Sequence, residues 1–217
     1  MRTFSYVLIR RNVRHLLGTL SLAVIFALLV TGSMPWITTA EKQDDLPQAT
    51  QTVFSNSSPI TINDAATATP YPSSIVVSGL GNYMPSTPGS VKVTLNNFSH
   101  TFPDDVGIVL FGPTGGALLL QDGAGAEPDM IGVTYTISDT GSTVLPDLTA
   151  WTAGTYKPTS YYDGDGFPAP GPGTAFANPG PAGGVTATFS SVFGGTNPNG
   201  TWSLFVVDFA TGHTGSI

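Results

Sequence analysis

Carboxylates are the side chains with the clearest potential for chemistry in this chain of 217 residues, and most of them fall in expected turns or at strand ends. Calcium binds about six to eight oxygen ligands, several of them carboxylates, and flexible loops can supply these ligands. Asp104, Asp105 and Asp122 flank one expected hairpin and therefore form the first candidate calcium site. Asp163 and Asp165 form a weaker candidate, because their segment lacks the third acid and the distant glutamate of an EF-hand loop. Aspartate is also a common turn residue, so the alternative is that all five are simply solvated.

Histidines and nucleophiles offer little support for catalysis. Beyond the N-terminal segment the chain has two histidines, His100 and His213, and His100 is close in sequence to Asp104 and Asp105, which could orient it. The sequence contains no Gly-x-Ser-x-Gly elbow, no His-Glu-x-x-His pair and no glycine-rich phosphate loop. It also contains no cysteine, which excludes cysteine nucleophiles, thiolate zinc sites and iron–sulfur clusters. We therefore expect a protein that is not an enzyme.

The elements that would position these carboxylates are expected to be short strands. Glycine (26 residues) and proline (18 residues) make up about a fifth of the chain, which is too much for a helical bundle. Charged residues account for only 10%, and the apolar and aromatic content is too high for a disordered chain. Many short strands joined by turns fit this composition, so we expect an all-β fold.

Apolar patterns mark the expected strands after residue 51. Alternation of apolar and polar residues is typical of a half-buried strand, and a continuous apolar run is typical of a central strand. Residues 112–115 have the composition of a turn that joins two such strands into a hairpin. No segment beyond residue 50 shows helical periodicity. The expected strands are 60–62, 75–80, 91–95, 106–111, 117–120, 133–137, 185–189 and 200–208.

The last of these strands carries the residue that we expect to anchor the core. Trp202, Leu204 and Val206 fall on one face of the extended segment, whereas Phe205 and Val207 make its other face apolar further along. This pattern predicts a strand that runs from the rim of a sheet into its interior. Trp202 is the largest apolar side chain there, so we assign it a structural role.

The N-terminal segment has the pattern of an export signal. Three arginines precede an apolar run at 16–30, and small residues ending at Ala40 offer a cleavage site. We expect residues 1–40 to be a helical signal peptide, followed by a flexible segment at 41–51. The alternative is an uncleaved membrane anchor, for which the run of fifteen residues is short against the ~20 that a span needs.

The charge distribution bears on possible partners. Removal of residues 1–40 would leave three basic and fourteen acidic residues, a net charge of −11. Such a surface repels nucleic acid and anionic lipid. We therefore expect no nucleic-acid partner, contact with a membrane only through an uncleaved N-terminal segment, and a secreted or cell-surface location.

A connection rich in proline and glycine, at 139–184, is long for a compact domain, and long loops are often functional. We expect it to lay aromatic side chains over an open end of the core, or alternatively to form a flap that contacts a ligand. If Trp151, Tyr161 and Tyr162 present their rings to a sugar, the protein would be a carbohydrate-binding module.

Two segments together resemble the P domain of subtilisin-like proprotein convertases, which is also found in bacterial secreted and surface proteins. The family has an apolar strand, His-Thr, an aspartate before an aliphatic residue and a Pro-x-Gly turn, and later Gly-x-Trp-x-Leu with aliphatics, Asp and Gly. The first segment here is the strand 91–95 followed by Ser99-His100-Thr101-Phe102-Pro103-Asp104-Asp105-Val106 and the turn 112–115. The second is Asn199-Gly200-Thr201-Trp202-Ser203-Leu204-Phe205-Val206-Val207-Asp208, with Gly215 after it. The match covers roughly residues 70–217.

The resemblance implies a jelly-roll β-sandwich at 52–217, in which His100 is structural and closes a turn through side-chain hydrogen bonds. In the convertases this module packs on a catalytic domain, is needed for its folding and activity, and does no chemistry itself. The family pattern continues into a closing strand, whereas this sequence stops at Ile217. We therefore expect the closing strand to be missing, which would leave an unpaired sheet edge.

The expected function is a non-catalytic extracellular β-sandwich module of P-domain type, which stabilises a neighbouring domain or binds surface proteins or glycans. One alternative is a regulatory piece of a secreted subtilisin-like serine protease whose catalytic part is absent from this sequence. In the convertases the catalytic domain precedes the module, whereas here a signal-like segment does. The other alternative is the carbohydrate-binding module, and calcium is the one cofactor expected.

Overall fold

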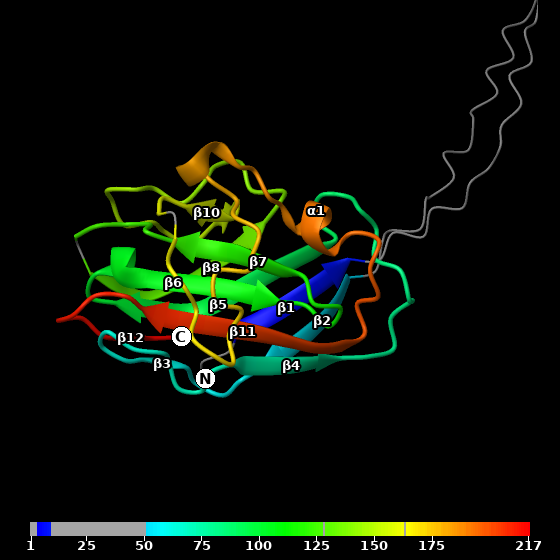
Figure 1. The fold of residues 1–217 in the computed structure, drawn as a ribbon, viewed down its shortest axis with the longest axis horizontal. Coiled ribbons are helices and arrows are strands. Elements are labelled where there is room, and N and C mark those ends of the chain that lie inside the picture. The colour runs from blue at the N-terminus through cyan, green and yellow to red at the C-terminus, as the bar shows by residue number, and fades with distance from the viewer. Residues whose placement is uncertain (1–3, 10–50, 128, 163) are drawn as a thin grey trace, which may run out of the picture. The chain divides into compact units, whose positions relative to one another are not determined.

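Figure 1 shows a computed structural model of the chain, which describes residues 4–9, 51–127, 129–162 and 164–217. The chain divides into two units, Met1–Arg11 with Thr50–Ile217, and Asn12–Ala49. The helix predicted within residues 1–40 is wrong at residues 4–9, which form a strand. The second unit lies outside the described residues, and so do most of the predicted signal peptide, the predicted flexible segment up to residue 50, and Asp163.

Two β-sheets build the described body (Figure 1). In the first sheet the strands follow the order β2 (Gln51–Asn56), β1 (Phe4–Ile9), β5 (Val91–His100), β12 (Gly215–Ser216) and β3 (Thr61–Ile62). Strands β8 (Met130–Ser138) and β9 (Thr155–Tyr156) extend this sheet from the other edge of β5. In the second sheet the order is β10 (Thr159–Ser160), β7 (Ala117–Asp122), β6 (Val106–Phe111), β11 (Gly200–Asp208) and β4 (Ser73–Val77).

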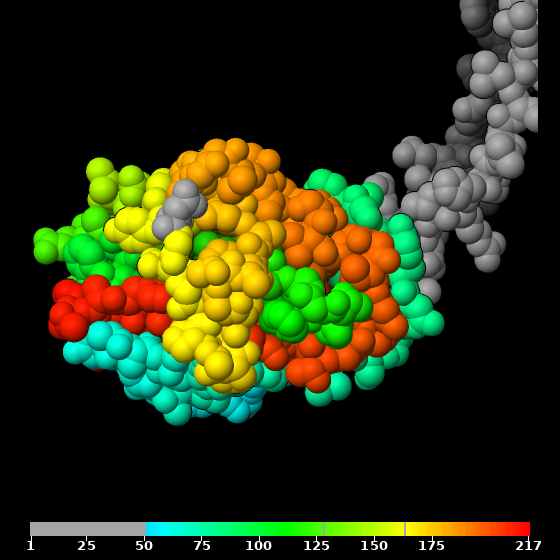
Figure 2. Space-filling model, in the orientation of Figure 1, coloured from blue at the N-terminus to red at the C-terminus, as the bar shows by residue number. Residues whose placement is uncertain are grey.

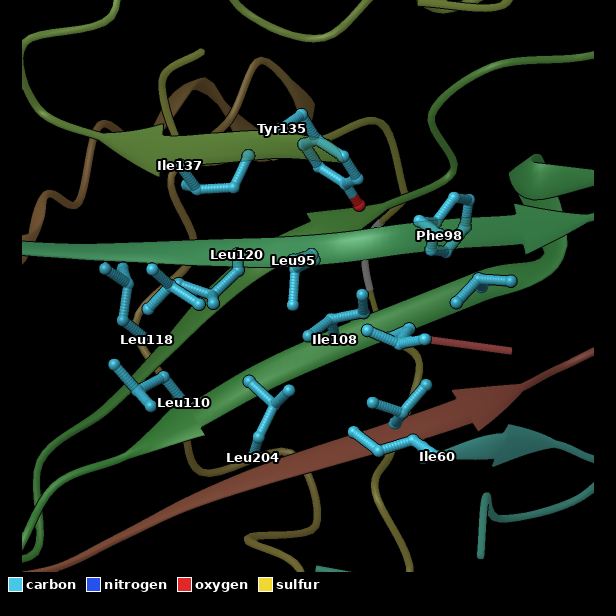
Figure 3. Packing of buried hydrophobic residues seen from close by; sticks show 14 of the residues in the cluster. Ile60, Leu95, Phe98, Ile108, Leu110, Leu118, Leu120, Tyr135, Ile137 and Leu204 are labelled. Carbon is cyan, nitrogen blue, oxygen red and sulfur yellow. The ribbon is translucent and has the colours of Figure 1, made fainter. Parts of the chain in front are cut away.

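The main core lies between the two sheets. Side chains of β5 alternate between buried and half-buried, and Val93, Leu95 and Phe98 of this strand pack in one cluster with Ile108 and Leu204 of the second sheet (Figure 3). The expected hairpin at 106–120 is confirmed, because β6 and β7 pair antiparallel across the turn that follows Phe111. The prediction of an all-β sandwich is therefore confirmed.

Strand β11 is covered on both of its faces, as its apolar pattern predicted. Trp202, Leu204 and Val206 belong to the main core, and Trp202 is 1% exposed. Its indole Nε1 donates a hydrogen bond to the carbonyl oxygen of Pro198 at 2.8 Å. Phe205 and Val207 point to the other side of the sheet, into a second and smaller apolar cluster.

The second cluster explains where the long connection runs. Phe167, in the middle of this connection, is fully buried there against residues of β6, β7 and β11. Figure 2 shows the yellow part of the connection lying across this face of the molecule. The connection also contributes β9, β10 and a short 3₁₀ helix, η2 (Ala182–Gly184). One part of the connection therefore covers the outer face of the second sheet, whereas Trp151, Tyr156 and Tyr161 pack in or against the main core.

The strand predicted at 185–189 is wrong. Residues 189–193 form a short helix, α1 (Phe189–Phe193), and residues 185–188 form no strand. The side chain of Thr188 accepts a hydrogen bond from the backbone N–H of Ser191, and the side chain of Ser191 accepts one from the backbone N–H of Thr188. Asp139 accepts two more, from the N–H groups of Phe189 and Ser190. These N-terminal caps favour a helix over the extended form that the apolar alternation suggested.

Candidate functional site

Four carboxylates gather at one end of the second sheet. Strands β7 and β11 both run antiparallel to β6, so their C-terminal ends lie beside the start of β6. Asp122 ends β7, and Asp208 ends β11. Asp104 and Asp105 belong to a 3₁₀ helix, η1 (Pro103–Asp105), which leads directly into β6. The sheet topology thus brings together acids that are far apart in the sequence.

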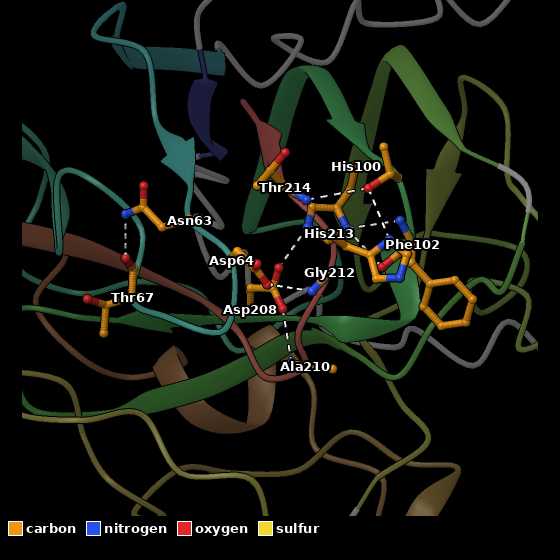
Figure 4. Close-up of polar contacts among 11 residues, drawn as sticks. Asn63, Asp64, Thr67, His100, Phe102, Asp208, Ala210, Gly212, His213 and Thr214 are labelled. Atoms are coloured by element: carbon orange, nitrogen blue, oxygen red, sulfur yellow. Dashed lines mark hydrogen bonds and ion pairs between the residues drawn. The ribbon is translucent and has the colours of Figure 1, made fainter.

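His100 and Asp208 form a buried pair at this end (Figure 4). The Nε2 atom of His100 lies 3.1 Å from Oδ2 of Asp208, and both side chains are fully shielded from solvent. The other carboxylate oxygen, Oδ1, accepts a hydrogen bond from the N–H group of Ala210 at 3.0 Å. Burial raises the pKa of Asp208, and the Ala210 N–H group and His100 partly offset this rise. Both oxygens of Asp208 therefore have a donor.

The second ring nitrogen of His100 contacts the backbone of Phe102. Its Nδ1 atom lies 2.8 Å from the carbonyl oxygen of Phe102 and 3.2 Å from the amide nitrogen. A protonated Nδ1 donates to the carbonyl, whereas an unprotonated Nδ1 accepts from the N–H group. His100 therefore closes a turn with its own side chain. In the described part of the chain neither nitrogen has a hydroxyl partner that it could activate as a base.

The carboxylate that holds His100 is not one of those nearest to it in sequence. Asp104 and Asp105 were the acids that sequence proximity suggested, but Asp208, 108 residues away, bonds the ring. Asp105 lies near this pair: burial raises its pKa most, and Asp208 raises it further, whereas His213 and His100 lower it. The one sequence signal for the pair is that His100 and Asp208 stand in the two segments that resemble a P domain.

A second histidine, His213, lies next to this pair, and no sequence pattern indicated a role for it. The Nδ1 atom of His213 is 3.2 Å from the hydroxyl oxygen of Thr101, and its ring stacks on Phe102 with the centroids 5.2 Å apart. The N–H group of Gly212 donates to Oδ1 of Asp64 at 2.7 Å. These contacts tie the loop after β11 to two other loops (Figure 4).

Asp122 is a buried carboxylate of a different kind. It is 2% exposed, and its pKa is raised to about 7, mainly because burial disfavours the charge and further because Asp165 and Asp104 are nearby. Tyr162 donates a hydrogen bond from its hydroxyl to Oδ2 of Asp104 at 2.6 Å. The structure thus joins members of both candidate calcium sites, Asp104, Asp122 and Asp165, into one acidic cluster. Asp105 instead lies beside the His100–Asp208 pair.

Unpartnered polar atoms occur at this end of the second sheet. Among the described residues, four buried side-chain atoms have no hydrogen-bond partner: Asp105 Oδ2, Gln121 Nε2, Asp122 Oδ1 and Trp151 Nε1. Asp105 lies in η1, Gln121 and Asp122 end β7, and the rings of Trp151 and Pro103 both lie against Gly125. Each such atom costs on the order of 1–3 kcal/mol. Buried atoms of this kind mark places where proteins bind water or ions.

The described carboxylates do not by themselves complete a metal site. Within residues 51–127, 129–162 and 164–217, no three histidine, cysteine, aspartate or glutamate side chains are arranged to hold a metal ion. Asp163, which the sequence analysis placed with Asp165, lies outside the described residues. Calcium also accepts backbone carbonyl oxygens and water as ligands. Calcium binding by Asp104, Asp105 and Asp122, or by Asp163 and Asp165, therefore stays a prediction.

The aromatic residues considered for sugar binding lie in different environments. Trp151 is buried in the core, where its ring stacks on Phe98 at 5.7 Å and meets Tyr135 edge-on at 5.3 Å. Tyr161 is half-buried, and its hydroxyl donates to the carbonyl oxygen of Leu145 at 2.7 Å. Tyr162 is exposed, at 46%. Trp151 therefore presents no face on which a sugar ring could stack.

Comparison of the chain with family models, with curated proteins and with solved structures finds no match. Within the described residues, no helix has both the length and the apolar character that a membrane span requires.

Proposed function

We propose that this chain is a non-catalytic extracellular β-sandwich module of P-domain type. The His100–Asp208 pair carries the proposal, because it joins the two segments on which the resemblance rests. Both nitrogens of the ring and both oxygens of the carboxylate are engaged inside the protein. A histidine held in this way stabilises a fold, whereas a catalytic base needs a nitrogen directed at the proton that it removes.

The role that follows is to hold a shape and present a surface. The proposed module stabilises a neighbouring domain or binds another surface component, in a secreted or cell-surface protein. The net charge of −11 beyond residue 40 supports partners other than nucleic acid.

Turnover assays test the non-catalytic role. The purified full chain is incubated with panels of peptide, ester and glycoside substrates, beside the variants His100→Ala and His213→Ala. We expect no turnover in any of the three proteins. Activity that disappears in the folded His100→Ala variant but persists in His213→Ala would overturn the proposal, because it would assign chemistry to the buried ring.

Export is tested separately. The full chain is expressed in a secreting host, and the N-terminus of the extracellular product is sequenced. We expect a product that begins at Glu41, after cleavage behind Ala40. A chain that stays in the cell with residues 1–40 attached would argue against the extracellular role.

A further inference from the structure

The N-terminal strand β1 lies between two strands of the first sheet (Figure 1). It pairs antiparallel with β2 over six residues, from Phe4 opposite Asn56 to Ile9 opposite Gln51. It also pairs antiparallel with β5 over four residues, from Ser5 opposite Thr94 to Leu8 opposite Val91. Strand β1 is the one strand that the described structure pairs with β2.

Strands β1 and β12 share one edge of β5. β12 pairs with β5 at Ser99 and His100, β1 pairs with it at 91–94, and both run antiparallel to β5. The opposite edge of β5 is paired with β8. In the structure β1 fills the part of this edge that β12 does not reach. We call the space between β2 and β5 the strand lane.

The strand lane matters because the predicted export signal contains β1. Cleavage behind Ala40 removes residues 4–9 and leaves the edges of β2 and β5 facing each other across one missing strand. Strands in a sheet lie ~4.8 Å apart, so this gap is wide enough for one extended segment. Exposed strand edges carry unpaired N–H and C=O groups, which readily pair with a strand from another chain.

The residues along the lane define the pattern that an inserted strand must have. Val91 and Val93 of β5 are buried, and Phe54 of β2 packs against the main core. Positions 6 and 8 of β1 stand opposite Val93 and Val91. Alternate residues of an inserted strand therefore meet the core and must be apolar, and a shift of one residue would turn the wrong set inward.

We propose that the strand lane is a strand-acceptor site, closed by residues 4–9 in the uncleaved chain and open, after cleavage, to an extended segment of a partner protein. The segment runs antiparallel to β5 with apolar residues at alternate positions, and main-chain hydrogen bonds to β2 and β5 give it affinity. This deepens the proposed function by naming the kind of surface partner. It rests on the export signal only for the cleaved form.

A proline variant of the full chain opens the lane. Proline has no N–H group, and successive residues of a strand direct theirs to opposite neighbours, so Tyr6→Pro with Val7→Pro removes one donor to β2 and one to β5. Amide hydrogen exchange is followed at 51–56 and 91–94, with β6 and β11 as internal controls for an intact fold. We expect both lane edges to lose protection while β6 and β11 keep theirs. Unchanged protection at both lane edges would overturn the proposal.

A synthetic peptide of residues 2–10 then serves as the partner strand. We expect it to restore protection at both edges of the proline variant and to leave the wild-type chain unchanged, because β1 already occupies the lane. The control is the same peptide with Tyr6→Asp and Leu8→Asp, which places charges opposite the buried Val93 and Val91. Failure of the matching peptide to restore protection, or equal restoration by both peptides, would overturn the proposal.

A cross-link keeps the proposal testable if the proline variant does not fold. The chain has no cysteine, so Ser5→Cys with Thr94→Cys introduces one pair that the register places directly opposite. We expect this pair to form a disulfide in the folded full chain. Ser5→Cys with Thr136→Cys, across β5 on β8, should not. Absence of the first disulfide would show that residues 4–9 do not lie in the lane. These experiments use the uncleaved chain, so their outcome is independent of secretion and of the turnover assays.

Discussion

Two buried carboxylates occupy equivalent places on either side of β6 and differ in how the fold treats them. Asp208 ends β11, and its two oxygens are bonded by His100 and by the N–H group of Ala210. Asp122 ends β7, its Oδ1 has no described partner, and its charged neighbours Asp165 and Asp104 have the same sign. The strand positions match, so the difference comes from the residues that the flanking segments supply.

This difference indicates that Asp208 belongs to a structural site, whereas Asp122 could bind a proton or a cation. Each oxygen of Asp208 has a donor, so removal of a partner should weaken the fold. Burial and like-charged neighbours destabilise the charged form of Asp122, and binding of a proton or a cation would offset this destabilisation. The predictions below test this contrast between Asp208 and Asp122.

Removal of the histidine should have the largest effect. His100→Ala leaves Asp208 buried with one donor, and a buried group that loses its hydrogen-bond partner costs about 1–3 kcal/mol, or more when the group is charged. Denaturant unfolding at neutral pH measures the loss. Asp208→Asn in the His100→Ala background should recover part of it, because the uncompensated charge is gone. A cost below ~1 kcal/mol for His100→Ala would mean that the pair does not stabilise the fold.

Replacement of Asp122 should have the next largest effect on stability, and the effect should have the opposite sign to that of His100→Ala. Its pKa in the folded protein is about 7, above the ordinary value of 3.8, so the folded state binds the proton more tightly than the unfolded state does. Its contribution to the free energy of unfolding is therefore present at low pH and is lost as pH rises from about 4 to about 7. The loss is on the order of 4 kcal/mol at most.

The variant Asp122→Asn isolates the contribution of Asp122, because the other titrating groups contribute equally to the stability of wild type and variant and cancel in the difference. We expect the variant to gain stability relative to the wild type as pH rises from about 4 to about 7. The exposed Asp129 gives the matched control, since Asp129→Asn makes the same change of charge without burial. A pH-independent difference in stability between Asp122→Asn and wild type would show that the pKa of Asp122 is not raised in the folded protein.

The sandwich and its central strand were predictable because their signals are local. Trp202, Leu204 and Val206 alternate within one strand, and the turn at 112–115 has the composition of a turn. Both signals come from residues that are neighbours in sequence. The cap at Thr188 is local in the same way, and it outweighs the apolar alternation at 185–189. The fold class therefore followed from the sequence, whereas one element type did not.

The site was predicted only in part, because its contacts are made by tertiary structure. The bond between His100 and Asp208 spans 108 residues, and no local pattern assigns that partner. The burial of Trp151 and the raised pKa of Asp122 depend on how the long connection packs. Sequence position indicated which acids lie at strand ends, and the sheet order decided which of them meet.

Calcium should raise the melting temperature if the acidic cluster binds it. A ligand present at a hundred times its dissociation constant stabilises by about 2.7 kcal/mol, which is several degrees for a domain of this size. We expect a larger shift at pH 8 than at pH 5, because protons compete for Asp122. Asp122→Asn should abolish the shift and Asp129→Asn should keep it. Identical melting curves in chelator and in millimolar calcium would remove calcium from this site.

The smallest effect should come from Tyr162, which is exposed and makes its bond at the rim of the acidic cluster. Its hydroxyl donates to Asp104 and is lost in Tyr162→Phe. Removal of one hydrogen bond to an exposed group costs about 0.5–1 kcal/mol, so stability should fall by no more than this amount. The bond to Asp104 also raises the pKa of Tyr162 to about 12. Burial raises the pKa of Tyr71 and Tyr135 too, so a spectroscopic titration should show one late-titrating tyrosine fewer in the variant than in wild type. If Asp122 and Asp104 act as one cluster, the variant should also change the pH dependence assigned to Asp122, because Asp104 loses a donor. If the stability of Tyr162→Phe depended on pH as that of the wild type does, Asp104 and Asp122 would not act as one cluster.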